Sequence, residues 1–346
     1  LDEAAVRELA RSIEGETAQV LAVEEKPFKQ RPAPPFTTST LQQEAGRKLG
    51  LSARRTMRAA QTLYENGVIT YMRTDSTALS KEAIDGARSF IRDQYGPDYL
   101  PEKPRHYKTK VKNAQEAHEA IRPAGASFQP IGRVRKEHGH EAANLYSLIW
   151  KRTVASQMPD ARGRRITVRV GVKDAVFRAA GKTIEFPGFQ RAYVEGSDDP
   201  DAELMEGESL LPPLAESQAL ATQQVEPEEH ATKPPARYTD ASLVKELDAK
   251  GIGRPSTWAS IIGVLLDRDY AFRNGSQLVP TFTGFAVVRM LREHFGSLLD
   301  YDFTARMEDE LDSVSRGEGD GKAYLRRFYM GNGETGLRDL VQTGQE

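Results

Sequence analysis

The sequence predicts an α+β multidomain protein with a discontinuous β arch domain and two mainly helical winged-helix-like domains. Its 346 residues exceed one ordinary hydrophobic core, so two or three domains are expected. Residues 17–23 alternate as a strand does, and a proline-rich crossing follows at residues 26–35. Three later segments alternate in the same way, residues 164–172, 176–180 and 186–194, and the pattern before them is helical. One plan of helix, turn, helix and strand occurs twice. We therefore predict the arch in residues 1–35 and 160–235, a first helical domain in 36–159 and a second in 236–346.

The composition is that of a chain that folds in water, with 38% hydrophobic and 28% charged residues. No run approaches the roughly 18 apolar residues of a membrane helix, and the first residues do not have a signal-peptide pattern. The absence of cysteine excludes disulfides and thiolate zinc sites within this sequence. These features fit a reducing compartment, and we expect a cytoplasmic location.

Charge is distributed unevenly, although the formal net charge is only −2. Residues 192–232 contain eleven of the 50 acidic residues and neither Lys nor Arg, which leaves 48 basic and 39 acidic residues elsewhere. Two short stretches, 46–59 and 103–112, hold five basic residues each. Such clusters are typical of phosphate-binding surfaces, although solvated basic faces are also common.

A first helix pair is expected after residue 37. Ser39 or Thr40 can cap a helix that ends at Gly50, and Ser52 can cap the next one. The second helix should end at Asn66-Gly67, before an extended segment over residues 68–72. Helix N-termini favour anions, and three arginines close to this one are candidate DNA contacts: Arg54, Arg55 and Arg58.

Tyr71 and Arg73 lie two positions apart at the end of this extended segment. In a strand they would point to the same side. A phenol oxygen beside a fixed guanidinium could attack a phosphate, because the cation stabilises charge on the phosphoryl oxygens. The alternative is an edge-strand tyrosine with a solvated arginine, and the two residues alone do not exclude it.

The last third of the chain repeats this plan at a shift of 202 residues, which places Leu63 on Leu265 and Glu44 on Glu246. In the second copy the turn is residues 251–257, GIGRPST, where Pro255 suits a first helical turn. Arg254 lies beside the amides of that helix start. If the repeat is real, two similar surfaces face one long ligand; the alternative is convergent patterning of two helix pairs.

Three motifs together carry a family resemblance: residues 69–76 (ITYMRTDS), 117–123 (AHEAIRP) and 251–257 (GIGRPST). Residues 35–44 and 303–311 add supporting matches. In this order and spacing they resemble bacterial DNA topoisomerase I, a type IA topoisomerase. The resemblance covers nearly the whole chain and implies a ring-shaped enzyme whose hole accommodates DNA.

The resemblance implies roles for individual residues. Tyr71 would attack a backbone phosphate of single-stranded DNA, forming a 5′-phosphotyrosine and freeing a 3′-hydroxyl. After strand passage, religation relaxes negative supercoils without ATP. Arg73 would contact the scissile phosphate, and His118 would position DNA or the active-site network. Three residues of the second helix pair would contact DNA: Arg254, Ser256 and Thr257.

The sequence also departs from that family. The resemblance implies Mg²⁺ held by an N-terminal toprim domain, and neither that domain nor C-terminal zinc modules are found in this sequence. We therefore expect a fragment that contains no metal site, binds DNA as a monomer associated with the nucleoid, and relaxes DNA poorly alone. The alternative function is a non-catalytic winged-helix DNA-binding module. A tyrosine recombinase is a weaker alternative, because no Arg and His constellation of that kind is evident.

Overall fold

The computed structural model describes residues 2–107, 119–196, 211–331 and 335–344. The chain divides into two compact units, which are described separately. Unit 1 consists of Leu1–Pro32, Asp98–Pro101 and Met158–Ala236; unit 2 consists of Ala33–Pro97, Glu102–Gln157 and Arg237–Glu346. The predicted division into three domains stays a prediction. Across these described ranges, no helix has the length and apolar character to cross a membrane.

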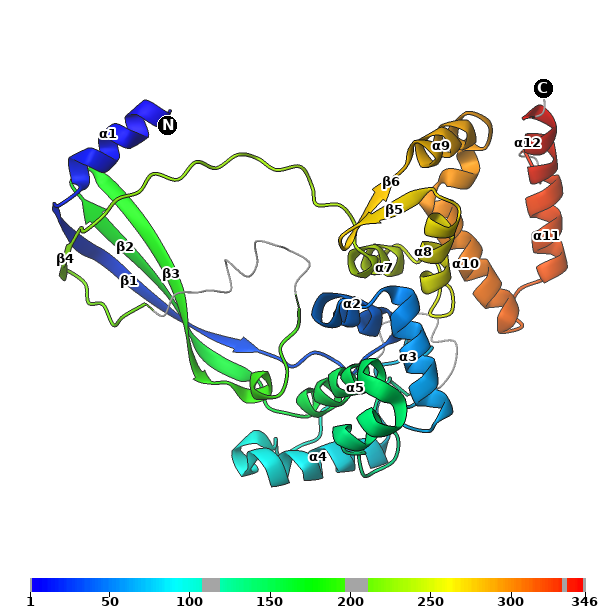
Figure 1. Cartoon of the computed structure of the whole chain (residues 1–346), viewed down its shortest axis with the longest axis horizontal. Helices are drawn as coiled ribbons and strands as arrows, with labels where there is room; N and C mark the ends of the chain where they lie inside the picture. The colour runs from blue at the N-terminus through cyan, green and yellow to red at the C-terminus, as the bar shows by residue number, and fades with distance from the viewer. Residues whose placement is uncertain (1, 108–118, 197–210, 332–334, 345–346) are drawn as a thin grey trace. The chain divides into compact units, whose positions relative to one another are not determined.

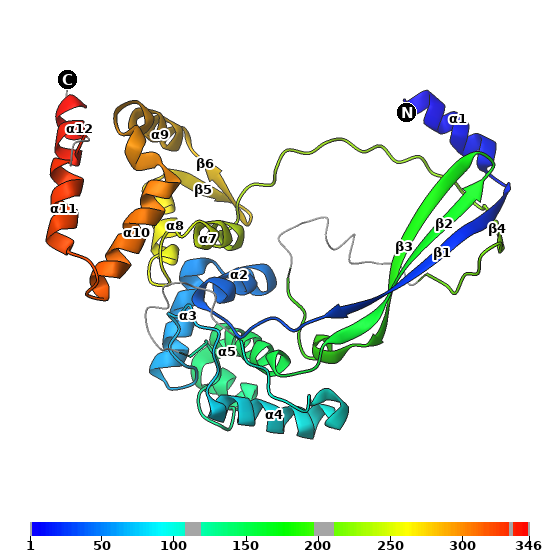
Figure 2. The ribbon, with the colours of Figure 1, turned by 180° about the vertical axis from the view of Figure 1, so that it is seen from behind.

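Unit 1 is built on a four-stranded antiparallel sheet in the order β3-β2-β1-β4. Three long strands form a curled ribbon, which Figures 1 and 2 show from opposite sides. The elements are α1 (Glu3–Ile13), β1 (Thr17–Gln30), β2 (Ala161–Val172), β3 (Ala175–Phe186), η2 (Gly188–Arg191) and β4 (Ala219–Ala221). Helix α1 lies at one end, where Ile13 packs in a small buried cluster with Ala18 and Val172.

Strand β1 is longer than the sequence predicts. We expected a strand over residues 17–23 and a proline-rich crossing from residue 26, but β1 continues through Pro27 to Gln30. Strand β4 pairs only with residues 17–19, so β1 is an edge strand at Pro27. An edge position tolerates proline because its missing N–H interrupts no central ladder. The expectation of a crossing was therefore wrong at this point.

The predicted strand over residues 186–194 is also wrong. Strand β3 ends at Phe186, and a short 3₁₀ helix follows. Gly188 has a φ of +50°, and an added Cβ would lie 2.5 Å from the carbonyl oxygens of Pro159 and Asp160. Only glycine fits this left-handed, close approach, so the chain must leave the strand here.

Unit 2 is mainly helical. It begins with α2 (Thr38–Leu49), α3 (Ala53–Glu65), α4 (Lys81–Tyr95) and α5 (Ile131–Ser156). It continues with α7 (Asp240–Ala249), α8 (Trp258–Asp267), β5 (Ala271–Asn274), β6 (Gln277–Pro280), α9 (Phe282–His294), η3 (Gly296–Leu299), α10 (Tyr301–Ser315), α11 (Gly321–Met330) and α12 (Leu337–Thr343). The predicted mixture of helices and β structure is confirmed, and the sheet is antiparallel. The description of the helical parts as winged-helix-like domains stays a prediction.

The repeat at a shift of 202 residues is confirmed by hydrogen bonds. The cap of α2 is Thr37, not Ser39 or Thr40 as predicted, because the helix begins at Thr38 and Thr40 is its third residue. Thr37 and Thr40 form a reciprocal capping box, and Thr239 and Ser242 form the same box at α7. The second helix of each pair ends alike: the Val68 amide donates to the Leu63 carbonyl, and the Tyr270 amide donates to that of Leu265. The preceding residues, Gly67 and Asp269, both have positive φ.

The strand pairing after each helix pair also corresponds. In the second copy, β5 and β6 form a hairpin in which Ala271 lies opposite Pro280. In the first copy, Ile69 lies opposite Pro123 in an isolated bridge, and the Ala124 amide donates to Val68. The second copy has the matching bond from Thr281 to Tyr270. The pair Ile69 and Pro123 therefore corresponds to the pair Ala271 and Pro280, and the predicted strand over residues 68–72 shrinks to a bridge.

The two helix pairs pack together, α2 against α7 and α3 against α8 (Figure 1). Gly46 permits the first contact, since a Cβ there would lie 3.2 Å from the Cβ of Ala241. Asp240 connects three elements. Its carboxylate accepts from the Ala53 amide at the start of α3 (2.8 Å) and from both terminal nitrogens of Arg273 on β5 (2.6 and 3.0 Å).

Replacing Asp240 with alanine is expected to lower the free energy of unfolding by about 2 kcal/mol. The substitution leaves the Ala53 amide without its acceptor and removes the partner of Arg273. The effect should be smaller than for a fully buried pair, because the Arg273 side chain is 34% exposed. Urea unfolding of D240A, R273A and the double variant measures it. Additive losses would contradict a direct coupling.

Tyr146 on α5 makes a pH-dependent contribution to the free energy of unfolding of unit 2. Its side chain is fully buried, and its hydroxyl donates to the Gln129 carbonyl at 2.9 Å. Burial raises the pKa of Tyr146 from 10.0 to about 12. Because the folded pKa lies above the unfolded one, this contribution is complete below about pH 10 and is lost as the pH rises through about 12.

We therefore expect alkaline destabilisation that depends on this hydroxyl. Between pH 9 and pH 11, wild-type protein should lose about 1 kcal/mol more stability than Tyr146→Phe, since one pKa unit corresponds to about 1.4 kcal/mol. Urea unfolding at the two pH values measures the difference. Equal losses in both proteins would show that Tyr146 does not titrate in this way.

Candidate nucleophile site and nucleic-acid interface

Thr38 fixes the segment that follows Tyr71. It is the first residue of α2, and its hydroxyl donates to the carbonyls of Met72 (2.8 Å) and Thr74 (3.1 Å). The Thr74 amide donates back to that hydroxyl at 2.8 Å, and the Thr38 amide donates to the Thr74 carbonyl. Thr38 and Thr74 are both buried. This side of the Tyr71 segment is therefore attached to the N-terminus of α2.

The residue before Tyr71 is attached on the other side. The Thr70 amide donates to the Arg122 carbonyl at 2.9 Å, and the Arg122 amide donates to the Thr70 hydroxyl at 3.0 Å. The Thr70 hydroxyl in turn donates to the Ala120 carbonyl at 2.7 Å. Tyr71 thus lies between two backbone anchors that come from different parts of unit 2.

Tyr71 is partly buried, and its ring meets Tyr64 of α3 edge-on at 5.2 Å between ring centres. Arg73 is exposed and makes no hydrogen bond or ion pair with any residue in the described ranges. Residues 71–80 form no strand, so strand alternation does not set the directions of the two side chains. The segment presents a supported phenol and, two residues later, a guanidinium that is open to an incoming anion.

Arg122 holds the residues around it in place through its side chain. It was not among the predicted site residues. Its side chain is buried and contacts Glu119 in an ion pair, the carbonyls of Pro123 and Gly125, and the Ser80 hydroxyl. A usable signal was its place between Ile121 and Pro123, where a charged residue interrupts a buried stretch. His118, the other predicted residue of this motif, lies outside the described residues.

Replacing Thr38 with valine tests the anchor beside Tyr71. Valine keeps the volume but removes the hydroxyl, which leaves the buried Thr74 amide without an acceptor. We expect a loss of about 1–3 kcal/mol in the free energy of unfolding. Thr38→Ser keeps the hydroxyl and should lose less. Urea unfolding of both variants checks this, and equal losses would mean that the hydroxyl is not the anchor.

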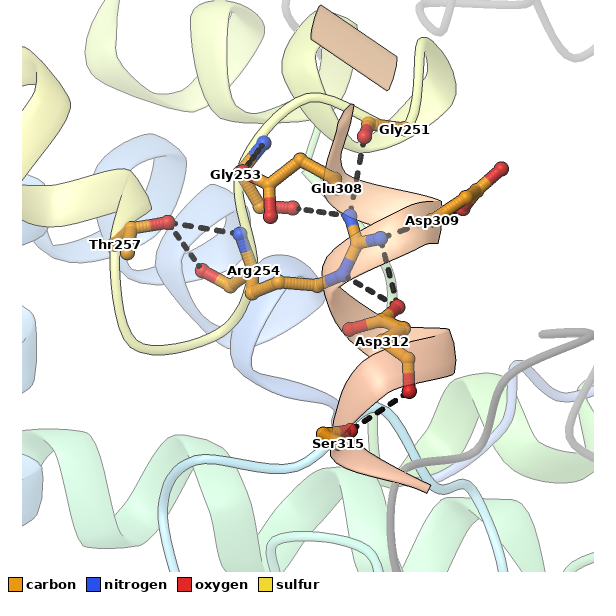
Figure 3. A network of polar contacts seen from close by, with 8 residues as sticks. All are labelled: Gly251, Gly253, Arg254, Thr257, Glu308, Asp309, Asp312 and Ser315. Atoms are coloured by element: carbon orange, nitrogen blue, oxygen red, sulfur yellow. Dashed lines mark hydrogen bonds and ion pairs between the residues drawn. The ribbon is translucent and has the colours of Figure 1, made fainter. Parts of the chain in front are cut away.

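Arg254 belongs to an internal network that Figure 3 shows from close by. Nε and one terminal nitrogen donate to Asp312 on α10 at 3.1 and 2.8 Å, and that terminal nitrogen also reaches Asp309 at 3.4 Å. The other terminal nitrogen donates to the carbonyls of Gly251 (3.1 Å) and Gly253 (2.8 Å). All five guanidinium hydrogens therefore have acceptors inside the protein.

This arrangement gives Arg254 a structural task. Burial disfavours its charged form, but the bonds to Asp312 and the negative charges of Asp312, Glu308 and Asp309 together outweigh that effect and raise the pKa of Arg254 above its ordinary value. The guanidinium joins the turn at residues 251–253 to α10, so a DNA contact by Arg254 would require an internal bond to break. The predicted DNA contact of this residue stays a prediction, with this network as its competitor.

The remaining candidate DNA contacts differ in whether their side chains already have hydrogen-bond or ion-pair partners within the protein. The Thr257 hydroxyl accepts from the Arg254 amide at 2.8 Å, whereas Ser256 is exposed. Arg54 pairs with Asp267 at 2.7 Å, and Arg55 pairs with Glu141. Arg58 is exposed and has no ion-pair or hydrogen-bond partner in the described part of the chain. Of the three arginines on α3, Arg58 is therefore the one most open to a phosphate.

In the ranges that the structure covers, no group of three or more His, Asp or Glu side chains is placed to hold a metal ion. The described residues therefore do not fit a Mg²⁺ site of the carboxylate-cluster type that the resemblance implies.

Comparison with known proteins decides the family. A family model described as DNA topoisomerase matches residues 1–326. The chain belongs to this DNA topoisomerase family. It is 57% identical over 338 residues to DNA topoisomerase 1 of Streptomyces coelicolor, and 55% identical over 344 residues to that of Synechococcus elongatus. The resemblance inferred from the sequence motifs is confirmed.

These matches cover nearly all of this chain but only part of each relative. The chain is covered to 96% and 99%, but it spans only 35% and 38% of these two topoisomerases. A solved structure of full-length topoisomerase I from Thermotoga maritima matches with a TM-score of 0.81 and 35% identity. That match covers 96% of this chain and 54% of the Thermotoga chain. The fold is therefore shared with part of that enzyme.

Proposed function

We propose that this chain supplies the nucleophile-bearing part of a type IA DNA topoisomerase. The observation that carries the proposal is the double anchoring of Tyr71 by Thr70 and Thr38 in a member of the DNA topoisomerase family. A nucleophile that breaks and reseals a backbone must hold its position while DNA is attached, and a segment fixed on both sides meets that need.

The proposed reaction is a reversible transfer of a phosphoryl group. The Tyr71 phenol oxygen bonds to phosphorus, the bond from phosphorus to the 3′-oxygen breaks, and the phenolic proton ends on the leaving 3′-oxygen. The products are a 5′-phosphotyrosine and a free 3′-hydroxyl. One phosphodiester bond replaces another, so the hydroxyl can reverse the step without ATP after another strand has passed.

We assign Arg73 to the scissile phosphate, because it is exposed, two residues from Tyr71 and without an internal partner among the described residues. A guanidinium there would stabilise charge on the phosphoryl oxygens as it develops. Arg58 is assigned to a more distant backbone phosphate of single-stranded DNA. Ser256 remains a candidate backbone contact, and Arg254 and Thr257 are assigned to shaping the turn that presents Ser256. His118 keeps the DNA-positioning role implied by the resemblance.

Mg²⁺ is proposed only for an enzyme that also contains a carboxylate cluster, since the described residues do not supply one. When bound there, the ion would offset charge on the DNA backbone. We further propose that the substrate is a single-stranded segment of negatively supercoiled DNA and that the chain acts as a monomer near the nucleoid.

Formation of a covalent adduct tests this proposal. This chain replaces the 338 matched residues of Streptomyces coelicolor DNA topoisomerase 1, and the chimera is incubated with Mg²⁺ and a labelled single-stranded oligonucleotide. We expect a protein–DNA adduct that survives denaturation, and relaxation of a supercoiled plasmid. The chain alone should bind the oligonucleotide but relax the plasmid poorly. Binding without any adduct in the chimera would instead favour a non-catalytic DNA-binding module.

A further inference from the structure

We propose that one face of the β1–β2–β3 sheet binds the sugar-phosphate backbone of DNA. Five residues define this basic face: Lys26, Arg165, Arg169, Arg178 and Lys182. The inference rests on the proposed function only in taking DNA as the ligand. The basic face belongs to unit 1, whereas Tyr71 belongs to unit 2, so binding here and covalent chemistry there can fail independently.

The strand register collects these side chains on one face. Lys26 on β1 lies opposite Arg165 on β2, and Arg165 lies opposite Lys182 on β3, which gives one basic row across three strands. Arg169 lies opposite Arg178 in a second row. Residues directly opposite each other share a face, and Arg165 and Arg169 do too because they are four positions apart.

On the other face of the same strands, the arginines have partners within the protein: Arg162 lies over the Phe186 ring, 5.2 Å from its centre. There Arg164 pairs with Glu25 at 2.8 Å and with Glu185 at 2.7 Å. That face also carries Ala18 and Val172, which pack against Ile13 of α1. One face is therefore covered or paired within the protein, and the strongly basic character is confined to the opposite one.

The basic face is electrostatically unfavourable for the protein alone. Like charges directly opposite each other destabilise a sheet, yet Arg169 and Arg178 occupy such a pair. Both arginines, and Arg165, are exposed and make no ion pair or hydrogen bond with any described residue. Glu24, an acid on this face, pairs with Lys26 at 3.3 Å.

An extended anion explains this arrangement better than solvation does. A surface built for solubility intersperses both signs of charge, as the opposite face does. Rows of cations spaced by the strand separation of about 4.8 Å present several donors in line, which suits a chain of phosphates rather than one small anion. Arginine also forms paired hydrogen bonds with phosphate oxygens.

A salt series tests the proposal. The full chain and its variants are titrated with a fluorescently labelled oligothymidylate and, separately, with a duplex, over increasing salt. The Arg169→Gln/Arg178→Gln variant should bind the oligothymidylate, the duplex or both about tenfold more weakly than wild type at low salt. The magnitude of the slope of log affinity against log salt should decrease by about one to two. The matched control, Arg162→Gln/Arg164→Gln, removes two charges from the opposite face and should leave the slope unchanged.

Two further readouts keep the test decisive. Arg169→Lys/Arg178→Lys retains both charges and should retain the salt slope. The melting midpoint of the Gln variant should equal or exceed that of wild type, since the like-charge pair is gone; a lowered midpoint together with weaker binding would instead indicate damage to the fold. Wild-type affinity and salt slope in the Gln variant for both DNA forms would overturn the proposal, even if Tyr71 forms its covalent adduct.

Discussion

Replacing Tyr71 with phenylalanine is expected to abolish the covalent adduct in the chimera described above. Phenylalanine keeps the ring that meets Tyr64 at 5.2 Å but lacks the attacking oxygen. Loss of a nucleophile removes roughly 10⁴-fold or more of the rate, which would place the adduct below detection. Affinity for the oligonucleotide should stay close to that of wild type, because the phenol contributes the reaction rather than most of the binding. Denaturing gels and a fluorescence titration measure the two properties.

Tyr64→Phe is the matched control. It removes a hydroxyl from the neighbouring ring and preserves the edge-on contact, so adduct formation should continue. An adduct that persists in Tyr71→Phe and disappears in Tyr64→Phe would transfer the nucleophile to Tyr64. Loss of the adduct in both variants, with DNA affinity intact, would show that the reaction also needs the Tyr64 hydroxyl, because both substitutions keep the contact between the rings.

Replacing Asp312 with alanine is expected to lower the free energy of unfolding by about 3 kcal/mol. The Asp312 carboxylate is 5% exposed and holds the Arg254 guanidinium, which is 21% exposed. Removing one partner leaves a largely buried charge without its main acceptor, which is one of the most destabilising changes that a single substitution makes. Urea unfolding followed by circular dichroism measures the loss.

Asp309→Ala is the internal comparison for this pair. Asp309 reaches the same guanidinium from the same helix, but it is 68% exposed and 3.4 Å away, so its removal should cost less than about 1 kcal/mol. Similar losses in the two variants would contradict the arrangement in Figure 3. Arg254→Gln removes the charge and adds a functional test: if Arg254 shapes the turn rather than contacting DNA, stability should fall while the salt slope of DNA binding stays unchanged.

The sequence predicted the helix pairs because local signals define them. A run of hydroxyl residues precedes the first helix pair, although the cap is Thr37 rather than the predicted Ser39 or Thr40, and Gly67 closes that pair with a positive φ. Those features belong to neighbouring residues, so a repeat at a fixed shift was visible. The full length of β1 could not be predicted in this way, because Pro27 normally argues against a strand. Only the pairing of β4 shows that β1 is an edge strand at Pro27.

Contacts between residues far apart in the sequence could not be predicted from local patterns. The strand that pairs with Ile69 lies at Pro123, beyond the segment that carries Tyr71, so residues 68–72 looked like an ordinary strand. Arg254 resembled a DNA contact at a helix start, since nothing nearby in the sequence reveals Asp312 on α10. The anchoring role of Thr38 was hidden for the same reason.

The polarity and position of the covalent link distinguish a 5′-phosphotyrosine at Tyr71 from every other adduct. The chimera is reacted with oligonucleotides labelled at either the 5′ or the 3′ end, and the trapped protein is digested for mass spectrometry. If Tyr71 forms a 5′-phosphotyrosine, the 3′-end label should stay on the protein, and the 5′-labelled piece should leave with a free 3′-hydroxyl. The nucleotide should be found on the peptide containing Tyr71. Retention of the 5′ label, or a nucleotide on any other tyrosine, would contradict this assignment.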